Sequence, residues 1–172
     1  MPLTKLNTQS ATSLDATKLT GNLPAISGAS LTGISSKILK VYNDYDSGDI
    51  GTSSNSLQDS GLSITLTPTA TSSDFYLIAD MGTQHHHNVT ASFVVKLLRD
   101  TTELRHFNSG YEGYLNQTHD RGYAPSLYHY IDQPNTTSSI TYKIQYRSES
   151  NGSTVNSLKG RQLTIFEIAG IE

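Results

Sequence analysis

Apolar and polar residues alternate with a period of two along much of the chain after residue 37. The clearest run lies between residues 140 and 147. Its apolar members are Ile140, Tyr142, Ile144 and Tyr146, and its polar members are Thr141, Lys143, Gln145 and Arg147. Leu62, Ile64 and Leu66 alternate in the same way. Because successive side chains of a strand point to opposite faces, this pattern predicts strands with one buried face.

Further segments extend the same all-β pattern. Phe75–Met81 is nearly all apolar, as expected of a central strand that is covered on both faces. In the long candidate Val89–Leu98, one face would carry Val89, Ala91, Phe93, Val95 and Leu97. The other expected strands are Ile38–Tyr45, Glu103–Phe107, Pro125–Ile131 and Leu163–Ile168. Loops rich in Gly, Ser, Asp and Asn separate them, chiefly over residues 46–60, 108–124 and 148–153.

These segments predict one domain over residues 37–172. We expect an antiparallel β-sandwich, jelly-roll-like in its connections, with about eight strands. No segment shows a convincing helical period.

The chain before residue 37 follows a different pattern, in which Thr17–Ile34 contains two Leu-Thr-Gly triplets. Gly, Ser and Pro are too frequent there for a helix, and a lone strand would bury too little surface. The evenly spaced apolar residues therefore need partners from other copies; they are Leu19, Leu23, Ile26, Leu31 and Ile34. We expect three copies to intertwine over residues 17–36 as a short shaft. The alternative is a flexible Gly/Ser-rich linker.

The run K-L-T-G-N-L-P-A-I-S-G-A-S-L-T-G, residues 18–33, resembles the short shaft repeats found near the N-termini of phage fibre proteins. This resemblance implies a homotrimeric fibre on a virion. Residues 1–16, which precede the shaft, would then be an extended arm. Such an arm could order by docking on other virion proteins.

Four short segments after Ser60 carry a second resemblance. They are Leu62–Pro68, Leu98–Thr101, Asp132–Gln145 and Leu163–Ile168. Their order and wording resemble a domain common in virion proteins of marine phages and cyanophages. The resemblance implies the sandwich fold and a virion location more than any particular activity.

Composition and charge argue against several classes of protein. The formal net charge is −3 and basic residues form no patch, so nucleic acid is not an expected partner. The chain has no cysteine, which excludes disulfides and thiolate-bound metals. The N-terminus lacks the apolar core of a signal peptide, and no apolar run approaches membrane-spanning length. We therefore expect synthesis in the host cytoplasm, assembly into a virion and no membrane insertion.

The run His85-His86-His87 is the feature that looks most like a metal site. On a strand, His85 and His87 would point to the same side. In a trimer, two imidazoles from each chain could surround an axis and hold a divalent transition metal. An H-x-H ring of this type resembles those of some phage fibre tips. The alternative is a solvated polar turn.

A Tyr-rich region is the better candidate for recognition of a host-surface glycan or protein. Its candidate residues are Tyr111, Tyr114, Asn116, His119, Asp120, Arg121 and Tyr123. Tyrosine offers a broad apolar face and a polar tip at low entropic cost, which suits binding. For the nearby Tyr128 and Tyr130, a place in the core or at a subunit interface is the preferred interpretation.

Catalysis has little support in the sequence. No G-x-S-x-G motif occurs, and no carboxylate pair of a glycosidase can be identified. Asp44, Asp46 and Asp49 could cradle Ca²⁺, but the loop lacks the distal Glu of an EF-hand, so a solvated loop is the default interpretation. We expect no enzyme activity and no cofactor.

The expected function is host-surface attachment by a short, homotrimeric, tail-associated fibre. Several weak sites on each fibre would raise avidity without a tight single contact. The alternative is a capsid decoration protein or head fibre with a structural role. A virion-bound hydrolase ranks third.

Overall fold

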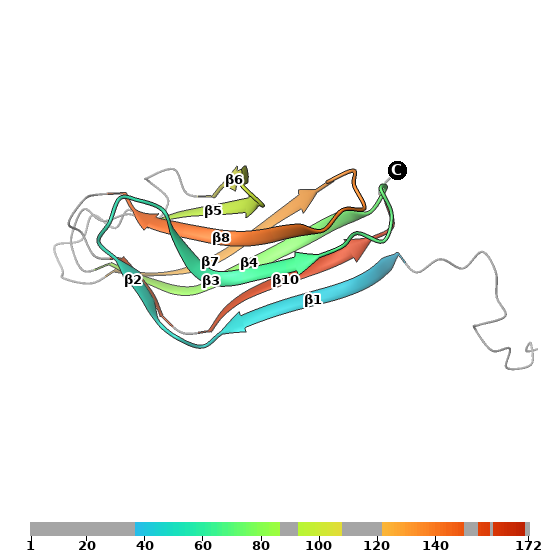
Figure 1. The fold of residues 1–172 in the computed structure, drawn as a ribbon. Coiled ribbons are helices and arrows are strands. Elements are labelled where there is room, and N and C mark those ends of the chain that lie inside the picture. Colours follow the sequence, from blue (N-terminus) through green and yellow to red (C-terminus); the bar gives the residue numbers. More distant parts are fainter. Residues whose placement is uncertain (1–36, 87–92, 108–121, 150–154, 159, 171–172) are drawn as a thin grey trace, which may run out of the picture. The chain divides into compact units, whose positions relative to one another are not determined.

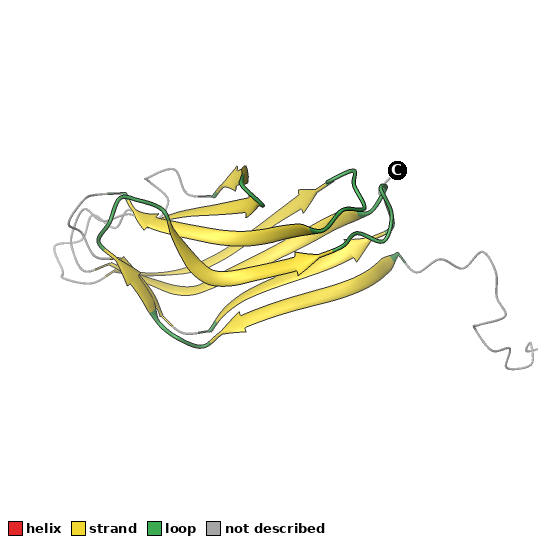
Figure 2. Ribbon diagram, viewed as in Figure 1, coloured by secondary structure: helices red, strands yellow, loops and turns green. Residues whose placement is uncertain are grey.

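The computed structural model describes residues 37–86, 93–107, 122–149, 155–158 and 160–170, all within one compact unit (Figure 1). The expected arm and the expected shaft, residues 1–36, lie outside the described residues. Within the described part of the chain, the regular structure consists of strands alone (Figure 2). The all-β prediction is therefore confirmed for this unit.

Ten strands are present in the described residues. They are β1 (Ile38–Asp46), β2 (Ile50–Thr52), β3 (Gln58–Leu66), β4 (Asp74–His86), β5 (Phe93–Arg99), β6 (Thr102–His106), β7 (Gly122–Asp132), β8 (Ile140–Ser148), β9 (Val155–Leu158) and β10 (Arg161–Ile168). The first sheet has the order β1-β10-β4-β9-β2, and β7 also pairs with β4. The second sheet has the order β3-β8-β5-β6. Both are antiparallel, and they pack together as a β-sandwich.

The strand pairs are nested around the short turn between β5 and β6. From outside to inside, β1 pairs with β10, β3 with β8, β4 with β7, and β5 with β6. The first half of the chain thus supplies one strand of each pair, and the second half returns antiparallel to supply the partners. Consequently the start of β1 and the end of β10 lie together, where Ile38 is the partner of Ile168.

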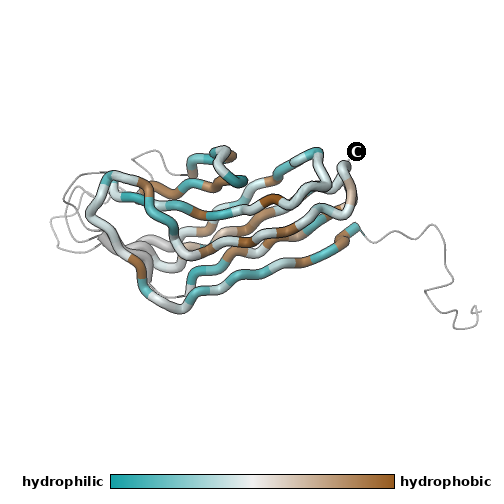
Figure 3. Tube along the Cα trace, viewed as in Figure 1, coloured by the Kyte–Doolittle hydropathy of each residue, from teal (hydrophilic) through white to brown (hydrophobic). Residues whose placement is uncertain are grey.

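The core lies between the sheets and follows the period of two. Leu62, Ile64 and Leu66 of β3 face it, and so do Tyr142 and Ile144 of β8. The first sheet adds Phe75, Leu77, Ala79, Met81, Leu163 and Ile165. Apolar and polar positions alternate visibly along these strands (Figure 3). Each large side chain buried here contributes about 1.5–3 kcal/mol relative to exposure.

Two short strands, β2 and β9, were not predicted. After a break in the sheet, β2 takes the place of β1 and β9 takes the place of β10. β9 and β10 pair with successive parts of β4, since Leu158 faces Thr83 and Gln162 faces Asp80. β2 then pairs with β9 as β1 pairs with β10. Strands of three and four residues are too short to show a period in the sequence.

Strand boundaries also differ from the predictions, because β3 and β7 each begin inside an expected loop. β3 starts at Gln58 rather than after Ser60, and β7 starts at Gly122 rather than Pro125. In both places a polar or Gly-rich sequence is held in a ladder by its neighbour, β8 or β4. Tertiary pairing has overridden weak local propensity there.

A buried arginine lies where the first sheet is interrupted. The Arg161 side chain is fully buried, and its Nη2 donates to Asp46 Oδ2 at 2.7 Å. Its Nη1 donates to the carbonyl oxygen of Gly48, which follows the end of β1. Gly61 of β3 has φ +89°, and a Cβ there would lie 3.0 Å from Asp46 Oδ2. The ion pair therefore joins β1 to β10, and β3 passes close to it at Gly61.

We predict that Asp46→Asn destabilises the fold by about 2 kcal/mol, because it leaves the buried Arg161 charge without its counter-ion. The matched control is Asp59→Asn, since Asp59 is exposed and lies 3.6 Å from Lys143. That change should alter stability by less than about 0.5 kcal/mol. Denaturant unfolding of both variants measures the difference, and equal midpoints would contradict the role given to Arg161.

Candidate functional site

The two ends of the sandwich are built from different parts of the chain. At the proximal end, defined by Ile38, Asp74 and Ile168, β1 begins and β10 stops. At the distal end, defined by His86, Gly122 and Val155, β4 stops while β7 and β9 begin (Figure 1). Residues 1–36 join the domain at the proximal end, because Lys37 precedes β1 directly. The distal end is therefore the part of the fold farthest along the strands from that junction.

Most of the predicted recognition residues lie outside the described residues. These are Tyr111, Tyr114, Asn116, His119, Asp120 and Arg121. The segment that carries them returns to the described chain at Gly122, whose partner is His86 at the distal end. Tyr123, the last predicted member, is part of β7.

The structure brings together two candidates that the sequence treated separately. His85 in β4 and Tyr123 in β7 are direct cross-strand partners, and Asn156 of β9 faces His85 from the other side. The Cα atoms of such partners lie about 4.5–5.5 Å apart. The metal candidate and the recognition candidate thus share the distal end. His87 lies outside the described residues, so a metal held by His85 and His87 stays a prediction.

The carboxylates considered for Ca²⁺ have structural partners. Asp44 Oδ2 accepts a hydrogen bond from Ser63 N at 2.8 Å, which fastens β1 to β3. Asp46 accepts from Arg161 and from Gly48 N. In the described part of the chain, no group of three or more His, Asp or Glu side chains could hold a metal ion. These aspartates are therefore assigned to the fold.

Tyr128 and Tyr130 are half-buried and pack against the core, in agreement with the preferred interpretation. The Tyr128 ring stacks on Phe107, with 4.7 Å between ring centroids. On the outer face of the first sheet, Tyr76, His129, Tyr130 and Ile131 line a shallow depression of about 350 Å³.

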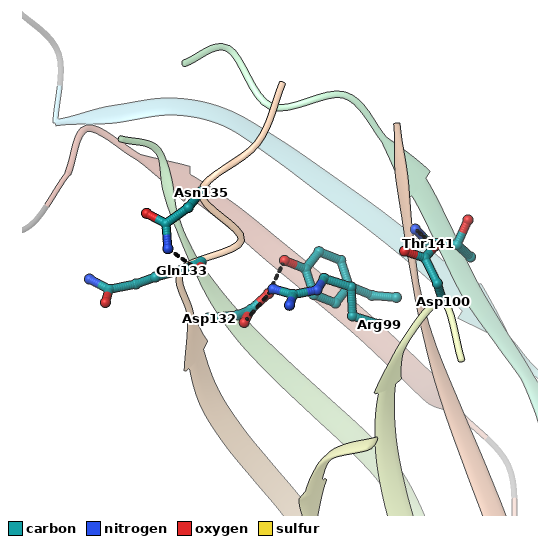
Figure 4. Close-up of polar contacts among 7 residues, drawn as sticks. Arg99, Asp100, Asp132, Gln133, Asn135 and Thr141 are labelled. Atoms are coloured by element: carbon teal, nitrogen blue, oxygen red, sulfur yellow. Dashed lines mark hydrogen bonds and ion pairs between the residues drawn. The ribbon is translucent and has the colours of Figure 1, made fainter. Parts of the chain in front are cut away.

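A polar cluster closes the proximal end between the two sheets (Figure 4). Arg99, at the end of β5, donates from Nη1 to both oxygens of Asp132, at 2.9 and 2.7 Å. Tyr142 of β8 donates its hydroxyl to Asp132 Oδ2 at 2.6 Å. Asp132 belongs to the first sheet, whereas Arg99 and Tyr142 belong to the second. The cluster therefore ties the sheets together.

This cluster is suited to stability rather than to catalysis. Burial raises the pKa of Tyr142, and its hydrogen bond to Asp132 raises that pKa further, so the phenol stays protonated. Both oxygens of Asp132 are occupied, and the side chain is buried. The expected strands Val89–Leu98 and Pro125–Ile131 stop one residue short of Arg99 and Asp132. Their opposite charges, each at the end of a strand, were the signal that could have paired them.

A second buried carboxylate, Glu167 of β10, lies at the same end. Its Oε1 accepts from Ser73 Oγ at 2.8 Å and from Thr69 N, which holds the turn between β3 and β4. Burial alone would raise the pKa of Glu167, but these hydrogen bonds outweigh it and leave the pKa lowered. Asp132 and Glu167 both belong to segments that carry the second resemblance. Here those segments serve the architecture of the proximal end.

No protein-family model matches the chain, and no curated protein matches it in sequence. Among the residues that the structure describes, no helix is long and apolar enough to cross a membrane.

We predict that Tyr142→Phe lowers stability by about 2 kcal/mol near neutral pH, because Asp132 loses a buried hydrogen bond. As the pH rises into the alkaline range, the variant should also lose less free energy of unfolding than the wild type. Above about pH 10 an unfolded tyrosine releases its proton, whereas folded Tyr142 holds it, so rising pH favours unfolding. The variant should lose up to about 1.4 kcal/mol per pH unit less than the wild type in this range.

Denaturant unfolding at about pH 8, 10 and 11 would measure both effects. Some alkaline sensitivity should persist in the variant, since burial also raises the pKa values of Tyr42 and Tyr146. Parallel pH curves for wild type and Tyr142→Phe would contradict the assignment.

Proposed function

We propose that this chain is a structural protein of a phage virion, a short homotrimeric tail-associated fibre that attaches to the host surface. The observation that supports it best is that the two ends of the sandwich carry different segments of the chain. The chain that carries the predicted arm and shaft joins at the proximal end, beside Ile38. The predicted recognition segment rejoins the fold at Gly122, at the distal end. An adhesive head needs this division between an anchored end and a presented end.

We further infer that the head is a jelly roll. β2 and β9 continue interrupted strands, so each sheet offers four strand positions. The nested pairs, from β1 with β10 to β5 with β6, describe one long antiparallel hairpin rolled into two sheets. Jelly rolls have this arrangement of two Greek keys.

The proposed mechanism is multivalent binding. Three chains held by a shaft would present three distal ends in parallel, and several fibres on a particle would multiply them. Linked weak sites raise avidity by about 10²–10⁴-fold without any new contact. Tyrosines of the recognition segment would stack on apolar faces of a glycan or protein, while Asp120 and Arg121 would hydrogen-bond its polar groups. No enzyme activity and no cofactor are part of this proposal.

The second candidate is a capsid decoration protein or head fibre, with a structural role. One observation favours it. In the described residues, large exposed apolar side chains gather on the outer face of the first sheet. Such a face suits packing between proteins. Cryo-electron microscopy of the intact virion separates the candidates, because a tail location supports attachment and a capsid location supports decoration.

We predict that the double variant Leu23→Asp, Ile26→Asp breaks the trimer, because charges would replace two apolar residues of the shaft. The matched control, Asn22→Asp with Ser27→Asp, adds the same charge at polar positions of the same segment. Light scattering should give a trimer for the wild type and the control. A monomeric wild type would refute the fibre proposal, and a trimeric Leu23→Asp, Ile26→Asp variant would refute the role of the shaft.

We predict that Tyr114→Ala with Arg121→Ala lowers adsorption of the virion at least about tenfold, because an aromatic anchor and a charged donor are typical binding hot spots. The control is Arg105→Ala, which changes an exposed residue of β6. Particle assembly and the unfolding midpoint should stay unchanged in both. Normal adsorption of the double variant would favour the decoration role.

A further inference from the structure

The two outer faces of the sandwich differ sharply in polarity. In the described residues, the large hydrophobic side chains that are exposed are Ile38, Val41, Tyr45, Leu57, Leu127 and Ile131. All of these except Leu57 belong to β1 or β7, which are edge strands of the first sheet. Their exposed fractions range from 49% for Ile131 to 69% for Leu127. Single exposed hydrophobic residues are normal, but five on one face require an explanation.

Cross-strand register joins two of these side chains, Val41 and Ile131, into an apolar row. Val41 faces Phe166, Phe166 faces Tyr76, and Tyr76 faces Ile131, so the row crosses β1, β10, β4 and β7. The rings of Phe166 and Tyr76 are 6.4 Å apart between centroids. The shallow depression beside Tyr76 and Ile131 lies at one end of this row.

The outer face of the second sheet shows what a solvated face of this fold looks like. There Lys143 lies beside Asp59, Lys96 pairs with Glu103, and Arg147 pairs with Glu149. Thr65 and Thr141 share a hydrogen bond between exposed hydroxyls. Charged and hydroxyl side chains hold these exposed positions, and the outward apolar residues of β5, Val94 and Leu98, are buried.

We propose that the outer face of the first sheet is the surface through which the heads of neighbouring copies of this chain pack together. This inference rests on the proposed homotrimer and names the face through which its three heads contact one another. The surface is defined by Ile38, Val41, Tyr45, Leu127 and Ile131, together with Tyr76 and Phe166 between them.

The position of the N-terminal segment argues for a second copy as the occupant. The predicted shaft ends at residue 36, and β1 begins two residues later with Ile38, the first residue of this face. A shaft that gathers three chains would hold their β1 strands at an effective concentration in the millimolar range. Apolar surfaces at such proximity would associate even if each contact were weak.

The charge pattern also favours a copy of the same chain. In the rows between β1 and β7, the described outer positions include one exposed carboxylate, Asp80, beside neutral groups such as Asn43, Thr164 and Gln162. Like surfaces can therefore meet with little repulsion. A three-fold ring needs two different patches on each subunit, and the β1 edge and the β7 edge supply them.

The test uses single cysteines in the full-length protein, which has no cysteine of its own. Val41→Cys and Ile131→Cys place a thiol at either edge of the proposed interface. Ser63→Cys, at an exposed position on the outer face of the second sheet, is the matched control. The rate of reaction with a small maleimide is measured for each variant, and light scattering gives the mass of the same sample.

If the inference holds, each variant is a trimer, and the thiols at positions 41 and 131 react at least about tenfold more slowly than the thiol at position 63. Equal rates in a trimer would overturn the packing of this face and leave the trimeric fibre intact. Equal rates in a monomer would refute the homotrimer and this inference together. Protection in a monomer would show that the chain's own N-terminal residues cover the face, which also overturns the inference.

Discussion

Two sheets that bury one face against each other leave only their outer faces and their ends free, and every other feature of this protein depends on that constraint. Leu62, Ile64, Tyr142 and Ile144 close the core from one side, and Phe75, Leu77 and Ile165 close it from the other. The period of two then fixes the direction of every intervening residue. A side chain that faces outward is free of the core, so its polarity can follow the needs of assembly. The outer face of the first sheet exposes five large apolar side chains, whereas the exposed side chains on the outer face of the second sheet form ion pairs.

The ends of the sandwich pose a harder problem, because strands stop there and the apolar core gives way to loops. Asp132 and Glu167 lie at the proximal end, and Arg161 lies where β1 and β10 meet a break in the sheet. Burying a charge is costly unless it is paired and hydrogen-bonded. Arg99 and Tyr142 hydrogen-bond to Asp132, Ser73 and Thr69 hydrogen-bond to Glu167, and Asp46 is the counter-ion of Arg161. Each cluster joins strands that are distant in sequence, so each specifies the fold beyond what apolar packing requires.

The sequence was most informative where one strand face is buried by a long, regular neighbour. The alternation from Ile140 to Arg147 became β8, and the apolar run from Phe75 to Met81 became the first part of β4. It was least informative about β2 and β9, whose short pairing comes from their neighbours. The polar clusters were missed for a related reason, since Arg99 and Asp132 are 33 residues apart and meet only after the sheets stack. The cross-strand pairing of His85 with Tyr123 likewise required the register, which no local pattern contains.

The proposed assembly and the proposed attachment would use different parts of this fold, namely the outer face of the first sheet and the distal end. Packing of heads along the outer face of the first sheet would align the strands of neighbouring copies, whose proximal ends the proposed shaft would gather. The distal ends would then point in one direction, each with the pairing of His85 and Tyr123 at its rim. A receptor site or a metal site at the distal end could use residues from several copies without disturbing the buried polar clusters. The clusters of Asp132 and Glu167 lie at the opposite, proximal end. On the proposed attachment function, variation at the distal end would therefore change binding while leaving the fold and the outer face of the first sheet intact.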